Sequence, residues 1–197
     1  MNTKVTVRMA TKADAKEILE IYAPYVKDTA ITFEYDVPSF EEFACRIDNI
    51  LKKYPYIVAI VNNQIIGCAY ASSFKDRAAY DWDAETTIYM RQNCRGKGLG
   101  KILYLALEGI LKRQNILNLN ACIAYTPTEN EHLTNASAYF HERLGYKKVA
   151  HFTKCGYKFE NWYDMIWMEK IIGEHYANPK PVIPISELDE LKYNFSE

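Results

Sequence analysis

A glycine-rich turn is the stretch of this 197-residue sequence whose residue types and spacing suggest chemistry most directly. It consists of Arg95, Gly96, Lys97, Gly98, Leu99 and Gly100, followed by Lys101. Glycines let the backbone approach a ligand closely, and the first N–H groups of a helix lack partners inside it. A turn of this kind suits a phosphate or pyrophosphate. The alternative is a plain tight turn with a solvated basic face.

Two better-known phosphate loops do not fit this spacing. A P-loop would need glycine at position 95 and a hydroxyl at position 102, where the chain has Arg95 and Ile102. A dinucleotide-binding fingerprint would need its third glycine at position 101 or 103, which are Lys101 and Leu103. The spacing that fits is Arg-x-x-Gly-x-Gly after a strand.

The elements on either side of the turn would position it. Before it, Thr86, Ile88 and Met90 alternate with Glu85, Thr87 and Tyr89, which predicts a strand with two distinct faces. After it, apolar residues recur at three- and four-residue spacing from 99 to 113, which predicts an amphipathic helix. The turn therefore joins the end of a strand to the start of a helix.

The rest of the chain predicts an α/β fold. Strands are expected at 5–10, 56–61, 65–71, 117–123, 146–155 and 157–171, and helices at 13–25, 39–53 and 135–144. Asn62-Asn63 predicts the turn of one hairpin, and Gly156 the turn of another. This order of elements favours a mixed sheet flanked by helices.

Composition narrows the function classes. A net charge of −1 leaves no overall basic footprint for nucleic acid, and no apolar run is long enough to span a membrane. The start of the sequence has no long apolar region, so no signal peptide is expected. Five scattered cysteines without a C-x-x-C pair predict neither a disulfide framework nor a zinc site, and no metal is expected. We expect a cytoplasmic protein.

Several motifs together resemble the GNAT acetyltransferases. The glycine turn is similar to their coenzyme A pyrophosphate loop, and the order of elements is similar to the GNAT fold, a mixed, mostly antiparallel sheet flanked by helices. The stretches 29–34, 77–89 and 141–146, followed by 156–158 and 162–164, resemble the phosphinothricin N-acetyltransferase branch in particular. The resemblance covers residues 3–172, so we expect a GNAT domain at 1–172 and a C-terminal extension at 173–197.

The resemblance implies transfer of an acetyl group from acetyl-CoA to an amine. The implied cofactor contacts are the turn residues Arg95, Gly96, Lys97, Gly98, Leu99, Gly100 and Lys101, the strand edge of Ile88, Tyr89 and Met90, and Asn135. The family's asparagine would align with Thr134, so Asn135 is the neighbouring candidate. Methionine sulfoximine-like or other small amino acids are the acceptors that the branch suggests, and a homodimer is expected.

Two residues are candidates for acid–base chemistry. Glu85 matches the family's glutamate and is the expected general base, because an ammonium has no lone pair until it loses a proton. His141 lies where many members carry a tyrosine proton donor, and with a pKa near neutrality it could protonate the leaving thiolate. The alternatives are an ordinary exposed strand glutamate and a histidine packed in a helix.

Acceptor binding is expected at Phe33, Lys75, Arg77 and Tyr80. An arginine suits the carboxylate of an amino acid, although the two cations could also be solvated loop residues. Two other functions stay open: acetylation of a protein or peptide amine, and a non-catalytic acyl-CoA sensor. A sensor would need neither Glu85 nor His141.

Overall fold

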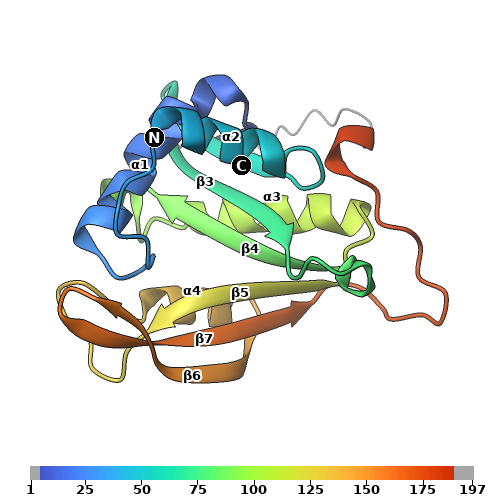
Figure 1. Ribbon diagram of the computed structural model, residues 1–197. Helices are drawn as coiled ribbons and strands as arrows, with labels where there is room; N and C mark the ends of the chain where they lie inside the picture. The colour runs from blue at the N-terminus through green and yellow to red at the C-terminus, as the bar shows by residue number, and fades with distance from the viewer. Residues whose placement is uncertain (1–4, 189–197) are drawn as a thin grey trace.

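The computed structural model describes residues 5–188, which form one seven-stranded sheet with helices on both faces (Figure 1). The strands are β1 (Thr6–Met9), β2 (Tyr56–Val61), β3 (Gln64–Ser73), β4 (Asp83–Met90), β5 (Asn118–Tyr125), β6 (Lys147–Lys158) and β7 (Asn161–Ile171). The longer helices are α1 (Ala15–Asp28), α2 (Phe40–Ile50), α3 (Leu99–Arg113) and α4 (Ala136–Arg143).

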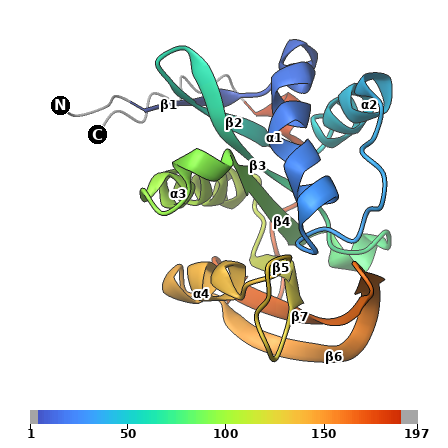
Figure 2. The same ribbon diagram turned by 90° about the vertical axis from the view of Figure 1, so that its left-hand side faces the viewer.

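The sheet has the order β1-β2-β3-β4-β5-β7-β6, and β4 with β5 is its one parallel pair among the described strands. Figure 2 shows α1 and α2 on one face of the β1–β4 half, while α3 and α4 lie on the other side. Two apolar cores follow from this division, one beneath α1 and α2 and one beneath α3. The expected α/β architecture, a mixed and mostly antiparallel sheet flanked by helices, is confirmed.

Local signals account for several element boundaries. The Ser39 hydroxyl caps α2 by accepting a hydrogen bond from the Glu42 N–H at 3.1 Å. Asn62 and Asn63 have φ values of 50° and 61°, the left-handed conformation that a two-residue hairpin turn between β2 and β3 requires. The helix predicted at 99–113 begins and ends as expected.

The hairpin turn predicted at Gly156 is wrong. Gly156 lies within β6 and pairs with Tyr163, and the chain turns instead at Phe159 and Glu160, where φ is 49° and 58°. A Cβ atom on Gly156 would lie 2.3 Å from the ring of Phe33. The glycine therefore makes room for a ring rather than a turn.

The C-terminal segment up to residue 188 lies along the surface of the chain's own domain. The Trp82 indole N–H donates to the carbonyl of Lys180 at 2.7 Å, and the Gln114 amide donates to the carbonyl of Ile183 at 2.8 Å. The extension is thus tied both to the segment before β4 and to the end of α3 (Figure 1). Within residues 5–188, no helix is long and apolar enough to cross a membrane.

Candidate active site

A groove opens where β4 and β5 part. The two strands pair only from Asp83 with Asn118 to Glu85 with Asn120. Beyond these pairs the β5-facing edge of β4 has no strand partner among the described residues. Side chains from both strands, α3 and the start of α4 line the groove, including Ile88, Tyr104, Ala124, Thr134, Ser137 and His141.

The glycine turn lies between the end of β4 and the N-terminus of α3. Gly96 and Gly98 have φ values of 74° and 78°, so both positions need the left-handed conformation that glycine adopts without strain. Arg95, Lys97 and Lys101 are exposed around them. The N-terminus of α3, the glycine backbone before it and three cations fit a pyrophosphate.

The strand edge next to this turn is partly used by the protein itself. The Tyr25 hydroxyl accepts from the Met90 N–H at 3.2 Å and donates to the Met90 carbonyl at 2.6 Å. Because Tyr25 occupies the backbone groups of Met90, the backbone of Ile88, two residues earlier on the same edge, is the part that an extended ligand could pair with.

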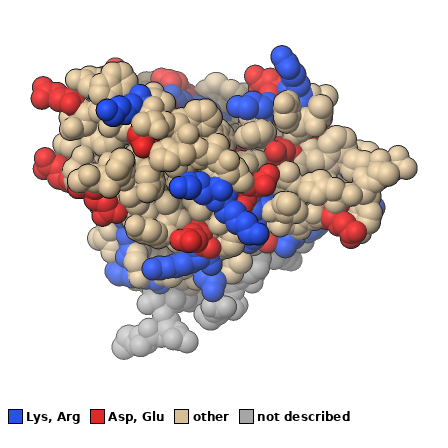
Figure 3. Space-filling view, turned by 90° about the horizontal axis from the view of Figure 1, so that it is seen from below, with Lys and Arg blue, Asp and Glu red and all other residues tan. Residues whose placement is uncertain are grey.

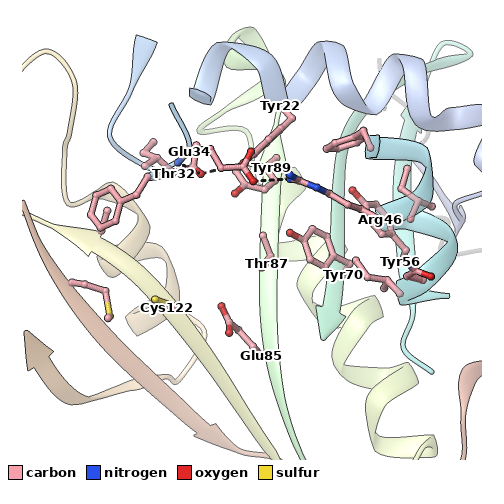
Figure 4. A pocket seen from close by; sticks show the side chains of 18 of the residues that line it. Tyr22, Thr32, Glu34, Arg46, Tyr56, Tyr70, Glu85, Thr87, Tyr89 and Cys122 are labelled. Carbon is pink, nitrogen blue, oxygen red and sulfur yellow. Dashed lines mark hydrogen bonds and ion pairs between the residues drawn. The ribbon is translucent and has the colours of Figure 1, made fainter. Parts of the chain in front are cut away.

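On the other face of β4 lies a cavity of about 700 Å³, bounded by α1, α2, β3 and the loop between the two helices (Figure 4). Its wall is aromatic and apolar with a few polar groups. Among the lining residues are Tyr22, Phe33, Glu34, Arg46, Tyr70, Glu85, Thr87, Tyr89 and Cys122. Three predicted site residues, Phe33, Glu85 and Tyr89, therefore line the same space, although Tyr89 was predicted as a cofactor contact.

Glu85 extends from β4 into this cavity (Figure 4). Burial raises its pKa above the usual glutamate range, while the nearby charge of Lys75 opposes the rise. Burial disfavours the charged carboxylate, so this glutamate binds a proton more readily than an exposed one. Such a carboxylate suits a general base.

His141 lies on the groove side and is only 2% exposed. Its Nδ1 is 2.8 Å from the Ser137 carbonyl, which can only accept, so Nδ1 carries the proton. Its Nε2 then accepts from the Tyr104 hydroxyl, also at 2.8 Å. Burial lowers the histidine pKa to about 4. The expectation of a His141 pKa near neutrality is therefore wrong, because the ring is enclosed and neutral at physiological pH.

Comparison with known proteins agrees with this geometry. The model of the acetyltransferase (GNAT) domain matches residues 7–167. The chain belongs to the GNAT acetyltransferase family. It is therefore an acetyl-CoA-dependent N-acetyltransferase with the open, splayed sheet that its groove requires.

Individual relatives point to one branch of this GNAT family. A phosphinothricin N-acetyltransferase of Streptomyces viridochromogenes is 30% identical, covering 93% of this chain and 96% of the relative. An L-methionine sulfoximine/L-methionine sulfone acetyltransferase of Salmonella typhimurium is 28% identical. That alignment covers 88% of this chain and 98% of the relative. The crystal structure of a phosphinothricin acetyltransferase from Sinorhizobium meliloti with acetyl-CoA has a TM-score of 0.83 at 33% identity, covering 93% and 97%.

The other predicted acceptor residues of this acetyltransferase lie outside the cavity wall. The Lys75 ammonium lies 5.0 Å from the Phe74 ring centroid, and its charge acts on Glu85. Arg77 and Tyr80 are exposed in the segment before β4 and do not line the cavity. Among these residues, Lys75 lies close enough to Glu85 for its charge to act on it, while Arg77 and Tyr80 do not line the cavity.

The structure corrects the prediction for Asn135. Its amide bridges the loop that precedes α4, accepting from the Thr126 N–H at 3.2 Å and donating to the Thr126 carbonyl at 2.9 Å. Both ends of the side chain are used inside the loop, while Thr134 lines the groove. The position that aligns with the family's asparagine, Thr134, therefore lines the groove, whereas Asn135 does not.

Several residues of the site were not predicted, among them Tyr104, Glu34, Arg46 and Tyr22. Tyr104 lies among the regularly spaced apolar residues of α3, so the sequence pattern predicts a core residue rather than a site residue. Glu34 and Arg46 form an ion pair at 2.7 Å on the cavity wall, and Tyr22 lies beside them (Figure 4). Glu34 directly follows Phe33, and that adjacency was the available signal.

A buried lysine holds the loop that carries Phe33 and Glu34. The Lys158 ammonium donates to the carbonyls of Val26, Thr29 and Thr32 at 2.8, 2.8 and 2.9 Å. Burial lowers its pKa, while the charge of Glu34 opposes that change. Lys158 at the end of β6 thereby fixes one wall of the cavity.

Proposed function

We propose that this N-acetyltransferase acetylates the amine of an amino acid or a close analogue. The position of Glu85 carries the proposal, since a half-buried carboxylate faces a ligand-sized cavity beside the opening between β4 and β5. The nearby Lys75 supplies a cation for a carboxylate on the acceptor. Relatives named for phosphinothricin and methionine sulfoximine support the same acceptor class.

Glu85 acts as the general base in this proposal. An amino acid reaches the site as an ammonium ion, which must lose a proton before its nitrogen can attack. The carboxylate accepts that proton directly or through one water. Its raised pKa strengthens it as a base relative to an exposed glutamate.

The residues around the groove fit acetyl-CoA. The pyrophosphate would be held by the turn at 95–101, and the pantetheine arm by the open β4 edge at Ile88. Acetyl-CoA supplies the acetyl thioester, whose carbonyl carbon the amine attacks. Thr134 and Ser137 complete the groove from the α4 side.

We assign stabilisation of the leaving sulfur to Tyr104, whose single hydroxyl proton turns from Nε2 of His141 to the sulfur as negative charge develops there. His141 is the positioning residue that holds this hydroxyl in the groove before the reaction. Burial raises the Tyr104 pKa well above its ordinary value, so the hydroxyl keeps its proton at neutral pH. A thiol has an ordinary pKa of about 8.5, below that of a tyrosine, so the hydroxyl stabilises the thiolate by donating a hydrogen bond rather than a whole proton.

The first test is thiol release from acetyl-CoA across a panel of amines. The panel holds phosphinothricin, methionine sulfoximine, methionine sulfone, the common amino acids, polyamines and short peptides. Turnover of amino acids well above that of polyamines and peptides is expected. Preference for a peptide would favour the protein-acetylating alternative, and tight acetyl-CoA binding without any turnover would favour the sensor.

We also propose a cytoplasmic homodimer that uses the β6–β7 hairpin. The exposed large side chains there include Val149, Phe152, Tyr157 and Trp162. That side of the molecule, seen in Figure 3, mixes both signs of charge with wide uncharged areas. Sedimentation at micromolar concentration tests the dimer, and a monomer would contradict it.

A further inference from the structure

The acceptor cavity extends well beyond the base. Along β4, Glu85, Thr87 and Tyr89 all face it, and the Cα atoms of the first and last are separated by roughly 13 Å at the usual strand rise. A volume of about 700 Å³ lies in the range that holds drug-sized ligands. The cavity is therefore longer than a small amino acid analogue needs.

Aromatic rings form the walls between the two ends. The Tyr56 and Tyr70 rings stack with centroids 4.7 Å apart, and Tyr22 stacks on Phe43 at 5.6 Å. The Tyr22 ring also meets Tyr89 edge-on at 4.8 Å. Walls of this kind favour an apolar or aromatic group on the ligand.

A polar cluster closes the far end. Arg46 is bound by two carboxylates, with its Nη1 atom 2.7 Å from Glu34 and its Nη2 atom 2.6 Å from Glu42. The guanidinium is thus already neutralised. Burial, and to a smaller extent the charge of Glu34, raises the pKa of the nearby Tyr22 hydroxyl. The Tyr22 hydroxyl itself shares a hydrogen bond with Thr32 at 3.1 Å.

One atom of this cluster stands apart. Glu34 Oε2 is buried and has no hydrogen-bond partner among the described residues, while its other oxygen binds Arg46. A buried carboxylate oxygen without a donor is costly, and a donor supplied by a ligand would relieve that cost. An anionic group placed there would instead be repelled by the same carboxylate.

We propose that the acceptor is an amino acid with an aromatic arm that ends in a hydrogen-bond donor, of the tyrosine type. The amine lies at Glu85, the ring between Tyr22 and Tyr70, and the terminal donor at Glu34 Oε2. This inference rests on the proposed function and specifies its acceptor. It makes Glu34 a specificity-determining residue and disfavours acceptors whose arm ends in a negative charge.

The test compares matched acceptors by thiol release: tyrosine, phenylalanine and O-methyltyrosine, with methionine sulfone and phosphinothricin as short acceptors. A hydrogen bond to a charged group contributes enough for a preference of about 10-fold or more. We expect kcat/KM for tyrosine to exceed that for phenylalanine and O-methyltyrosine by at least that factor. Tyrosine should also exceed both short acceptors.

Two variants identify the carboxylate responsible. Glu34→Gln keeps the shape and should shrink the tyrosine-to-phenylalanine ratio about fivefold, since a neutral acceptor binds more weakly. Glu42→Gln also removes a partner of Arg46 but lies outside the cavity wall, so the ratio should stay unchanged. Acetyl-CoA affinity serves as the folding control for both.

The outcomes separate the inference from the proposed function. Turnover of amino acids with equal tyrosine and phenylalanine values, or with methionine sulfone preferred, would overturn the inference while the proposed function stands. An unchanged ratio in Glu34→Gln would overturn the assignment of that residue. No thiol release from any amine would overturn the proposed function and the inference with it.

Discussion

The two faces of β4 carry opposite kinds of chemistry. Glu85 faces a cavity with charged groups at both ends and an aromatic middle. On the other face, Thr86 takes part in a buried, uncharged network, in which its hydroxyl lies 3.1 Å from the Tyr146 hydroxyl and Tyr104 binds His141. Strand alternation places these environments back to back within one residue step.

The difference between the two faces indicates which of their side chains can change protonation state. In the proposed reaction, the face of β4 that carries Glu85, here called the acceptor face, takes up a proton. Burial raises the pKa of its carboxylate, while the charge of Lys75 opposes the rise. In the same proposal, the opposite face, here called the donor face, stabilises the leaving sulfur, and burial keeps its His141 side chain neutral. One face of β4 therefore carries a carboxylate that can change its protonation, and the other carries uncharged hydrogen-bonding groups.

Glu85→Gln should break the acceptor face and give the largest effect. Removing a general base costs on the order of 10²-fold or more in kcat. Acetyl-CoA affinity should stay within a few-fold, because the groove and the glycine turn are untouched. Stopped assays of thiol release and a calorimetric titration of acetyl-CoA check both quantities.

Glu169→Gln is the matched control for that change. Glu169 on β7 pairs with Asn120, the same residue that pairs with Glu85 on β4, yet it lies outside the cavity wall. Its kcat should stay within twofold of wild type. Equal losses in the two variants would show a general effect of acidic residues and remove Glu85 as the base.

His141 should make stability depend on pH from the donor face. Its pKa falls from an ordinary 6.5 to about 4 on folding, so between these values the unfolded chain binds a proton that the folded chain does not. This contribution is complete above pH 6.5 and is lost as the pH falls to 4, up to about 3 kcal/mol. The free energy of unfolding, measured with urea at several pH values in that range, should change less with pH in His141→Gln than in the wild type. Identical slopes would mean that the ring titrates normally.

Much of this division was predictable from the sequence. Alternation along 85–90 gave both faces of β4, and the glycine spacing with the apolar repeat after it gave the turn and α3. The hairpin turn predicted at Gly156 is wrong because a glycine can mark either a turn or a need for space, and Gly156 meets a need for space. The Phe33 ring that uses this space comes from a loop more than 120 positions away, and sequence pattern carries no such pairing.

The site was predictable only where a residue stood in a motif. Arg46 looks like a solvated helix cation, since Glu42 one turn earlier is its expected surface partner. Its second partner, Glu34, reaches it only through the fold. The pKa of His141 likewise depends on how completely Tyr104 and Ser137 enclose it, and burial of that degree follows from packing rather than from local pattern.

Tyr104→Phe should sharpen the comparison from the donor side. Losing the hydroxyl removes the proposed donor to the leaving sulfur and leaves Nε2 of His141 buried without its partner. We expect kcat to fall about 10-fold with the acceptor KM unchanged. Tyr146→Phe, which removes another buried hydroxyl bound to Thr86, should stay within twofold. A similar loss in both variants would indicate a packing effect.

The smallest effect is expected at the glycine turn, which in the proposed function holds the pyrophosphate of acetyl-CoA. Lys97 and Lys101 are exposed, so each should contribute only about threefold to acetyl-CoA affinity at low ionic strength. Salt should erase that contribution, because the Debye length shrinks to about 3 Å at 1 M. Lys112→Ala, at the opposite end of α3 and paired with Glu108, should leave affinity unchanged at every salt concentration. A loss in Lys97→Ala or Lys101→Ala that persists at 1 M salt would contradict a purely electrostatic role and indicate a direct, partly buried contact with the pyrophosphate.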